Sequence, residues 1–175
     1  MTTSNEGRKV DPWRFAGGFL QKVLSRNIPD PPDHPPIPWA PVTKPLSEGR
    51  VALLTTAGIS MRGDTPFDMD GERKRPTWGD PSWRRIAATA TAESIEANHL
   101  HIDTSYIERD LNVALPLDRL RELVDAGEVG SIADTHYSVM GYQGASSATL
   151  ENESAPEIAE SMVSEEVDFA LLAPV

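Results

Sequence analysis

Two apolar runs constrain the fold of this chain more than any other feature of its sequence. Residues 51–57 read Val-Ala-Leu-Leu-Thr-Thr-Ala and end at Gly58, and residues 167–175 read Val-Asp-Phe-Ala-Leu-Leu-Ala-Pro-Val. Near-continuous apolar runs of this length are typical of strands in a parallel sheet that is covered on both faces. Both runs are therefore predicted to be buried strands of an α/β domain.

Helical and strand patterns alternate between these two runs. A stripe of leucines predicts a helix over residues 116–126, and a capping box of Ser154 and Glu157 predicts the start of a last helix. Shorter strands are expected at residues 84–86, 98–102 and 131–140. The alternation predicts a Rossmann-like three-layer α/β domain with a mostly parallel sheet.

The last predicted strand indicates where in the fold a reactive site is expected. In such a sheet each strand normally continues into a crossover helix, and the reactive crevice lies beyond the carboxyl ends of the strands. The sequence stops at Val175, at that edge. Either residues 167–175 are the last strand, or a chemically important part is missing. We favour the second interpretation, so the domain is expected to be truncated after this strand.

The N-terminal part differs in composition from the rest. Residues 12–26 carry apolar side chains at helical spacing and predict a short amphipathic helix, weakened by Gly17 and Gly18. Residues 29–41 hold seven of the 15 prolines and predict an extended strap. We therefore expect a leader over residues 1–37 and the α/β domain over residues 38–175.

Charge and composition exclude several classes of partner. The net charge of −11 argues against binding to nucleic acid or to an anionic membrane surface. No apolar run is long enough for a transmembrane helix, and no secretory signal is visible, so a cytoplasmic protein is expected. The sequence contains no cysteine, which removes disulfides and thiolates from these 175 residues.

The densest group of chemically active residues is His99, His101 and Asp103. In a strand over residues 98–102 both imidazoles would project from one face, as a metal-ligand pair or an acid–base pair that Asp103 orients. The alternative is a set of hydrogen-bonded polar residues near a strand end. Since no distant third ligand is visible, no metal site is predicted.

Other candidates are isolated. Asp110 and Asn112 precede the helix at 116–126 and suit either a turn and cap or a binding site. His136 lies inside a predicted strand, where a histidine is either an interior residue or a catalytic one. No nucleotide-binding glycine motif or serine nucleophile elbow is present. From the residues alone, the chain is an acidic α/β domain without an assigned reaction.

An ordered series of segments adds a family resemblance. It begins with residues 39–44, 50–59 and 66–68, continues with residues 79–84, 110–112 and 116–123, and extends through His136 to Asp168. In this series the chain resembles the selenoprotein B family of glycine, sarcosine and betaine reductases, which includes the selenocysteine subunit of D-proline reductase. The resemblance covers about residues 38–175.

The resemblance implies a redox centre just beyond this chain. In the family a selenocysteine, sometimes a cysteine, follows the last strand, so it would come directly after Val175. Selenocysteine is encoded by UGA, which is ordinarily read as a stop. The implied reaction is reductive cleavage of a carbon–nitrogen bond in a small zwitterionic or amine substrate, often activated by a pyruvoyl group on a partner reductase subunit. No further cofactor is implied in this chain.

The same resemblance suggests roles for individual residues. His99, Asp103 and His136 match family positions and are expected to orient substrate or donate protons, with Asp110 and Asn112 as substrate-binding residues. The chain departs from the better-known reductases in its proline-rich leader and at Ile102, where they carry tyrosine. These departures leave the identity of the substrate open.

Two other functions stay open. The chain would instead be a non-catalytic binding or partner subunit if it kept the fold without the redox centre. In either case a partner reductase subunit or a homo-oligomer is expected. A metal-dependent hydrolase built on His99 and His101 is the third reading.

Overall fold

The computed structural model describes residues 18, 22 and 40–175. The chain divides into two units, Met1–Pro41 and Val42–Val175, and the second carries the fold described below. Apart from Gly18 and Lys22, which are helical, the helix predicted at residues 12–26 lies outside the described residues, as does most of the proline-rich stretch.

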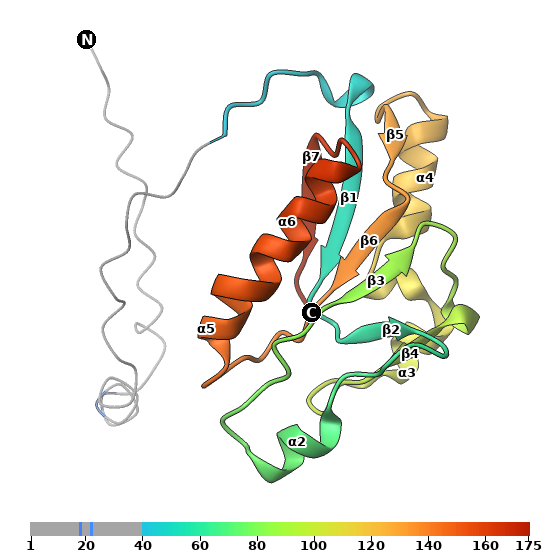
Figure 1. Ribbon diagram of the computed structural model, residues 1–175. Coiled ribbons are helices and arrows are strands. Elements are labelled where there is room, and N and C mark those ends of the chain that lie inside the picture. Colours follow the sequence, from blue (N-terminus) through green and yellow to red (C-terminus); the bar gives the residue numbers. More distant parts are fainter. Residues whose placement is uncertain (1–17, 19–21, 23–39) are drawn as a thin grey trace. The chain divides into compact units, whose positions relative to one another are not determined.

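The second unit is built on a five-stranded, mostly parallel sheet (Figure 1). The central strand β1 pairs in parallel with three strands, and one edge strand, β3, runs antiparallel to β6. The strands are β1 (Arg50–Thr55), β3 (Arg84–Ala87), β5 (Ser131–Ile132), β6 (Thr135–Ser138) and β7 (Phe169–Ala173). The predicted α/β fold with a mostly parallel sheet is confirmed.

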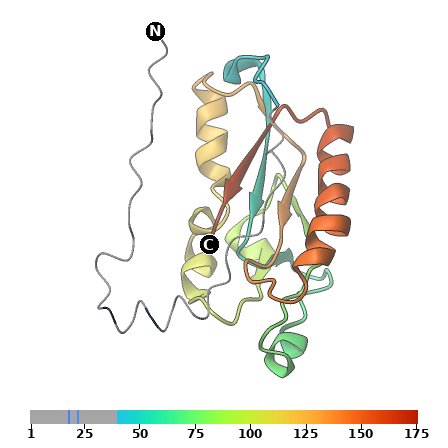
Figure 2. The same ribbon diagram turned by 90° about the vertical axis from the view of Figure 1, so that its left-hand side faces the viewer.

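Helices cover both faces of this sheet (Figure 2). Helix α4 (Leu117–Asp125) lies on one face, and α6 (Ala155–Ser164) lies on the other. Alternate residues of β1 serve the two layers: Leu53 belongs to the cluster that contains Leu120 of α4, whereas Ala52 belongs to the cluster that contains Ile158 of α6. The apolar character of residues 51–57 thus follows from burial on both faces, and the helix predicted at 116–126 is confirmed.

The predicted strand at 131–140 is interrupted. It forms β5 and β6, which both lie beside β1 and are separated by Ala133 and Asp134. The backbone N–H of Ala133 still donates to Val51 across the interruption (2.9 Å), and the Asp134 carboxylate pairs with Arg50 (3.0 Å). The strand therefore keeps its place in the sheet despite the break.

The predicted capping box at Ser154 is wrong. Helical residues already precede it, because α5 (Ser147–Thr149) continues through a π-helical segment (Leu150–Ser154) into α6. Ser154 has helical backbone angles, and its hydroxyl donates to the carbonyl of Pro81 (2.7 Å). The hydroxyl joins the helix to the loop before β3 instead of capping a helix start.

The strand predicted at residues 98–102 is also wrong. The strand lies earlier, as β4 (Ile95–Ala97), which pairs with β2 (Ile59–Met61) in a separate two-stranded sheet. Residues 98–102 form a loop, in which the backbone N–H of His101 donates to the His99 ring instead of to a neighbouring strand (3.1 Å). The argument that put both imidazoles on one strand face therefore does not apply.

Short helices complete the unit. The turn-rich stretch before β3 contains α2 (Met69–Lys74), and α3 (Ser105–Arg109) follows the loop at 98–102. Short 3-10 helices lie at Leu46–Glu48, Ala92–Ser94 and Leu111–Val113. Within the described residues no helix is long and apolar enough to cross a membrane.

Strand β7 is not buried as predicted. It is a sheet edge that pairs, within the described residues, with β1 alone. Leu171 is 51% exposed and Leu172 is 65% exposed. Because successive side chains of a strand point to opposite faces, both faces of β7 are open. Its apolar sequence therefore reflects a surface that the described chain does not cover.

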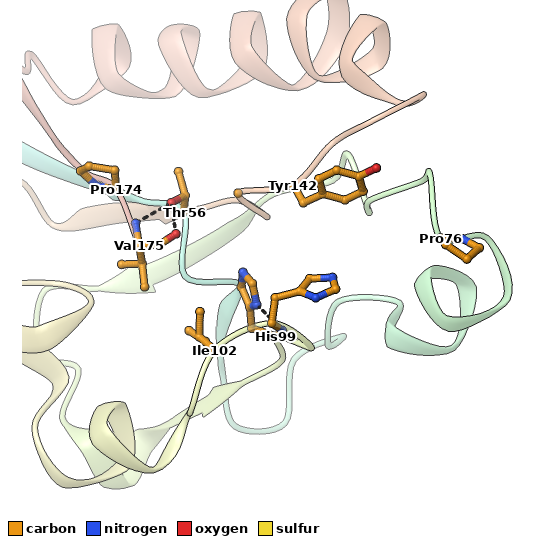
Figure 3. Close-up of a pocket in the computed structure, with 9 residues that line it drawn as sticks. Thr56, Pro76, His99, Ile102, Tyr142, Pro174 and Val175 are labelled. Carbon is orange, nitrogen blue, oxygen red and sulfur yellow. Dashed lines mark hydrogen bonds between the residues drawn. The ribbon is translucent and has the colours of Figure 1, made fainter. Parts of the chain in front are cut away.

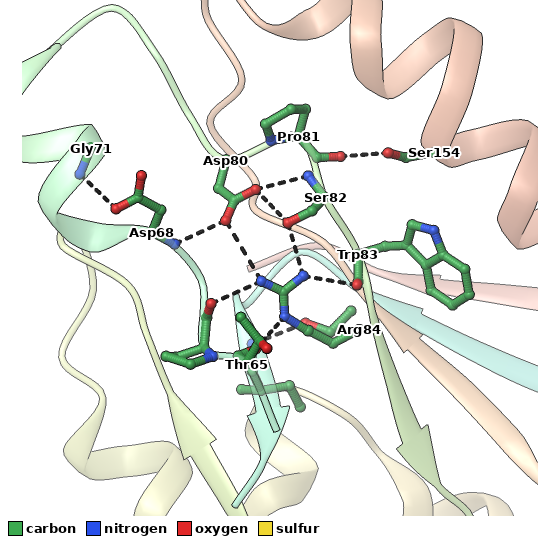
Figure 4. A network of polar contacts seen from close by, with 12 residues as sticks. Thr65, Asp68, Gly71, Asp80, Pro81, Ser82, Trp83, Arg84 and Ser154 are labelled. Carbon is green, nitrogen blue, oxygen red and sulfur yellow. Dashed lines mark hydrogen bonds and ion pairs between the residues drawn. The ribbon is translucent and has the colours of Figure 1, made fainter. Parts of the chain in front are cut away.

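A buried polar network joins β3 to the turn-rich stretch (Figure 4). The Arg84 guanidinium donates to the carbonyls of Thr65 (2.6 Å) and Pro66 (2.9 Å) and lies 3.7 Å from the Asp80 carboxylate. Asp80 in turn accepts from the backbone N–H of Asp68 (2.9 Å). Burial lowers the pKa of Arg84, while Asp80 opposes that shift. The network fixes the segment that leads into α2.

Candidate functional site

The candidate site is a pocket of about 670 Å³ at the carboxyl ends of the parallel strands (Figure 3). Thr56 follows β1, Gly141 and Tyr142 follow β6, and Pro174 and Val175 follow β7. The remaining lining residues are Pro76, His99, His101 and Ile102. Strand ends of this kind are where open α/β sheets bind their ligands.

Thr56 holds the end of β7 in this pocket. Its hydroxyl accepts a hydrogen bond from the backbone N–H of Val175 (2.9 Å) and lies 3.3 Å from the Val175 carbonyl oxygen (Figure 3). These contacts continue the pairing of β1 with β7 beyond the last paired residues, Thr55 and Ala173. The backbone of Val175 is therefore fixed beside the end of β1.

Asp168 holds the other end of β7. Its carboxylate accepts from the backbone N–H of Arg50 (2.9 Å) and pairs with Lys44 (2.7 Å). The hydrogen bond from Lys44, and then the one from Arg50, lower the pKa of Asp168. Its own backbone N–H donates to the Arg50 carbonyl (2.9 Å). The register of β7 on β1 is thus set at both ends of the strand.

The two histidines of the loop reach the same pocket in different environments. Their rings lie 5.9 Å apart between centroids and are nearly perpendicular. Nδ1 of His99 accepts the backbone N–H of His101, so a neutral His99 carries its proton on Nε2. Burial lowers the pKa of His99, and Glu72 only partly opposes this shift. His99 is therefore neutral at pH 7.

Glu72 is the functional residue that sequence reasoning missed. Its side chain is 3% exposed, and its Oε1 lies 2.9 Å from Nε2 of His101. Helix α2 places it there, and Asp68 caps this helix by accepting the N–H of Gly71 (2.8 Å). In the sequence Glu72 sits beside basic residues in a turn-rich stretch, so no pattern separates it from an exposed glutamate.

Two loops support the wall at Pro76 and Tyr142. The backbone N–H of Ala145 donates to Thr77 (2.7 Å), and that of Gly79 donates to Gln143 (3.2 Å). A Cβ at Gly79 would lie 1.7 Å from the carbonyl oxygen of Tyr142, so only glycine permits this approach. The wall is consequently held by backbone contacts.

The other predicted site residues do not line this pocket. Asp103 accepts the N–H of Ser105 (3.0 Å) at the start of α3, and hydrogen bonding from the Ser105 side chain, and then from its backbone, lowers the pKa of Asp103. Asp110 accepts from the N–H of Asn112 (3.0 Å), while the Asn112 amide also donates to Asp118 (2.9 Å). Asp110 and Asn112 border a separate cavity of about 210 Å³. The structure thus gives these three residues turn and cap contacts.

His136 lies inside the sheet. It is fully buried, and its Nδ1 accepts the backbone N–H of Leu53 (3.0 Å) next to the break between β5 and β6. Burial lowers its pKa to about 4. The side chain therefore replaces a backbone hydrogen bond between strands and is neutral at pH 7. Its Nε2 has no hydrogen-bond partner among the described residues.

Among the described residues, no group of three or more histidine, aspartate and glutamate side chains is placed to hold a metal ion. The two imidazoles of the pocket have Glu72 as their acidic neighbour, and it contacts His101 directly. The arrangement favours proton transfer in a mostly apolar pocket. Ile102 lines this same pocket.

Comparisons with known proteins match this chain over most of its length. The family model described as glycine/sarcosine/betaine reductase selenoprotein B matches residues 28–174. The chain is 33% identical over 151 residues to the D-proline reductase subunit gamma of Acetoanaerobium sticklandii, a match that covers 86% of this chain and 58% of that relative. No solved structure matches the chain significantly.

A second relative gives a similar result. The glycine reductase complex component B subunit gamma of Symbiobacterium thermophilum is 32% identical over 139 residues, which cover 78% of this chain and 30% of the relative. This chain therefore spans little more than half of the first relative and under a third of the second.

Proposed function

This chain belongs to the glycine/sarcosine/betaine reductase selenoprotein B family, and from that premise we propose that it supplies part of the active site of a reductase component. The proposed reaction is reductive cleavage of a carbon–nitrogen bond in a small zwitterionic or amine substrate. A partner reductase subunit, on which a pyruvoyl group would activate the substrate, completes the proposed complex.

The observation that carries this proposal is the position of Val175. Val175 lines the pocket together with His99 and His101, and Thr56 fixes its backbone there. A selenocysteine directly after Val175 would begin at the edge of the same pocket. Such a residue supplies a selenolate, a nucleophile that is ionised at neutral pH as a thiolate of low pKa would be.

The residues of this chain would then bind and orient the substrate and manage protons. His99, neutral and with its proton on Nε2, donates a hydrogen bond to a substrate carboxylate or leaving nitrogen. Pro76, Ile102 and Pro174 give the pocket an apolar lining that limits water. Asp103 and His136 act indirectly in this proposal, by shaping the loop before α3 and the strand beside β1.

The test is to sequence the gene through and beyond the codon for Val175. The expected result is an in-frame UGA followed by an open frame that encodes a cysteine. Expression of that whole gene in a host that inserts selenocysteine should then give a protein with one selenium atom per chain by elemental analysis. The matched control is the same gene with the UGA changed to a serine codon, which should contain no selenium and cleave no substrate.

A UAA or UAG codon with no open frame behind it would contradict the proposal. The chain would then be a partner subunit without the redox centre, and the exposed strand β7 would be the first surface at which to look for its binding partner.

A further inference from the structure

A buried acid that contacts His101, a lining residue of the pocket, has no role in the proposed function. The Glu72 side chain is almost completely buried, and the only hydrogen bond to its carboxylate from the described residues is that of His101, at 2.9 Å. An ionised carboxylate without a partner is expensive to bury, so a fold retains one where a hydrogen-bonded or cationic group compensates it. His101 is that group.

We infer that Glu72 and His101 form a proton-transfer pair in this pocket, in which the carboxylate holds the ring by Nε2 and leaves Nδ1 to exchange a proton with bound substrate. The inference rests on the proposed reductase site and deepens it. His101 is the catalytic residue of the pair, because it lines the pocket. Glu72 is a positioning residue that acts through it.

The geometry separates the two nitrogens of the His101 ring. Nε2 faces Glu72, the His101 side chain is 60% exposed, and His101 lines the pocket. A carboxylate on one nitrogen fixes the ring's orientation and tautomer and stabilises the imidazolium form. When Nδ1 gives its proton to a leaving amine nitrogen, the ring becomes neutral and keeps Nε2–H on Glu72. No electrons pass through the pair.

The neighbours of His101 fit this role. The titratable groups in contact with its ring are Glu72 from α2, His99 from its own loop and Tyr142 from the loop after β6. His99 is kept neutral, since burial lowers its pKa. One imidazole of the pocket is thus hydrogen-bonded to the Glu72 carboxylate, whereas the other has no hydrogen bond to it among the described residues.

The first test uses the 175-residue chain and needs no activity. Diethyl pyrocarbonate modifies unprotonated imidazole, and mass spectrometry gives the rate at each histidine separately. Glu72→Gln keeps a hydrogen-bond acceptor and removes the charge. We expect the modification rate of His101 to rise in this variant, because the ring loses the charged partner that holds its Nε2. The rate at His99 should change less.

The rates at the two histidines separate loss of the Glu72 contact from a loosened loop. In Glu72→Gln the rate should rise at His101 more than at His99, whereas a loosened loop would raise both rates equally. Glu128→Gln, which alters an exposed glutamate in the loop after α4, is the matched control and should leave both rates unchanged. An unchanged rate at His101 in Glu72→Gln would overturn the inference.

The second test uses the reductase assembled from the whole gene and its partner subunits. His101→Gln should lower kcat about 100-fold, as expected for loss of a general acid, with a smaller change in KM. Glu72→Gln should lower kcat about tenfold, in the range of other supporting residues. A normal kcat in His101→Gln would overturn the pair. An assembled wild type that cleaves no substrate would instead contradict the proposed function, and the modification experiment would still decide the pair.

Discussion

At the scale of single residues, His136 is an interior histidine with a measurable consequence. It is fully buried, its Nδ1 accepts the N–H of Leu53, and burial lowers its pKa to about 4. An unfolded histidine titrates near pH 6.5. Between these two values the unfolded chain binds a proton that the folded chain does not, so the folded state loses stability as the pH falls.

The expected loss is substantial. Above about pH 6.5, His136 lowers the stability of the folded state very little. Between pH 7 and pH 5, the free energy of unfolding should fall by about 2 kcal/mol. Urea denaturation at both pH values measures it. His136→Gln, which cannot be protonated, should be less stable at pH 7 but should lack this part of the pH dependence. An equally steep loss in the variant would show that other groups cause it.

The comparison of unfolding free energies at pH 7 and pH 5 needs a second variant, at His99. The pKa of His99 is also lowered by burial, so it contributes in the same direction. His99→Gln measures that contribution separately. Carboxylates with lowered pKa values, such as Asp168, lose their stabilising effect only as the pH falls below about 4. The interval from pH 7 to pH 5 therefore isolates the histidines.

Residue chemistry was only partly predictable from the sequence. The cluster of His99 and His101 was found because histidines two residues apart are unusual, although the strand used to explain it is absent. Glu72 was not found, since its burial depends on how α2 packs against a loop far along the chain. Sequence spacing indicates which residues are chemically able to act, whereas burial of a charged group is set by tertiary contacts.

At the scale of elements, β1 and β7 make a matched pair for testing burial. Leu53 of β1 and Leu171 of β7 are directly paired across the sheet, yet Leu53 is fully buried and Leu171 is 51% exposed. Leu53→Ala should cost about 2–5 kcal/mol of unfolding free energy, because it leaves a cavity in the core. Leu171→Ala should cost less than about 1 kcal/mol.

Urea denaturation of the two variants, at protein concentrations where the chain is monomeric, checks this difference. Equal costs would mean that β7 is covered in solution. Leu171→Lys extends the test, since a charge on an open apolar edge should reduce self-association in sedimentation velocity without a matching loss of stability.

The elements that the sequence predicted well are those whose pattern is local. Helix α4 and strand β1 were predicted because a leucine stripe and an apolar run determine them nearly alone. The prediction of a helix cap at Ser154 was wrong because a capping box describes the start of a helix, whereas here the helix runs through residues 147–164. The prediction that β7 is buried failed for a different reason. An apolar strand indicates that burial of its side chains is favourable, but not that the described chain packs other residues against them.

At the scale of the whole molecule, the boundary between the leader and the domain is open to a direct test. Both hydrophobic clusters of the described residues are built from residues within 51–169. A chain of residues 42–175 is therefore expected to unfold cooperatively, with a free energy within about 1 kcal/mol of that of the full chain. Urea denaturation followed by tryptophan fluorescence and by circular dichroism measures it.

A non-cooperative transition, or probes that disagree, would contradict this expectation and assign part of the stability to residues 1–41. The matched control is the full chain with a neutral tag of similar length at the same end, which shows whether handling of the N-terminus alone alters the transition.

The two fixed ends of β7 have a consequence for how this gene can vary. Asp168 anchors the strand to Arg50, and Thr56 anchors Val175. Inserting or deleting one residue between these anchors would turn every later side chain to the opposite face of the sheet. Across the family, this stretch should thus accept substitutions freely while its length stays constant, because the number of residues from Asp168 onward determines which side chain lies beside Thr56 in the pocket.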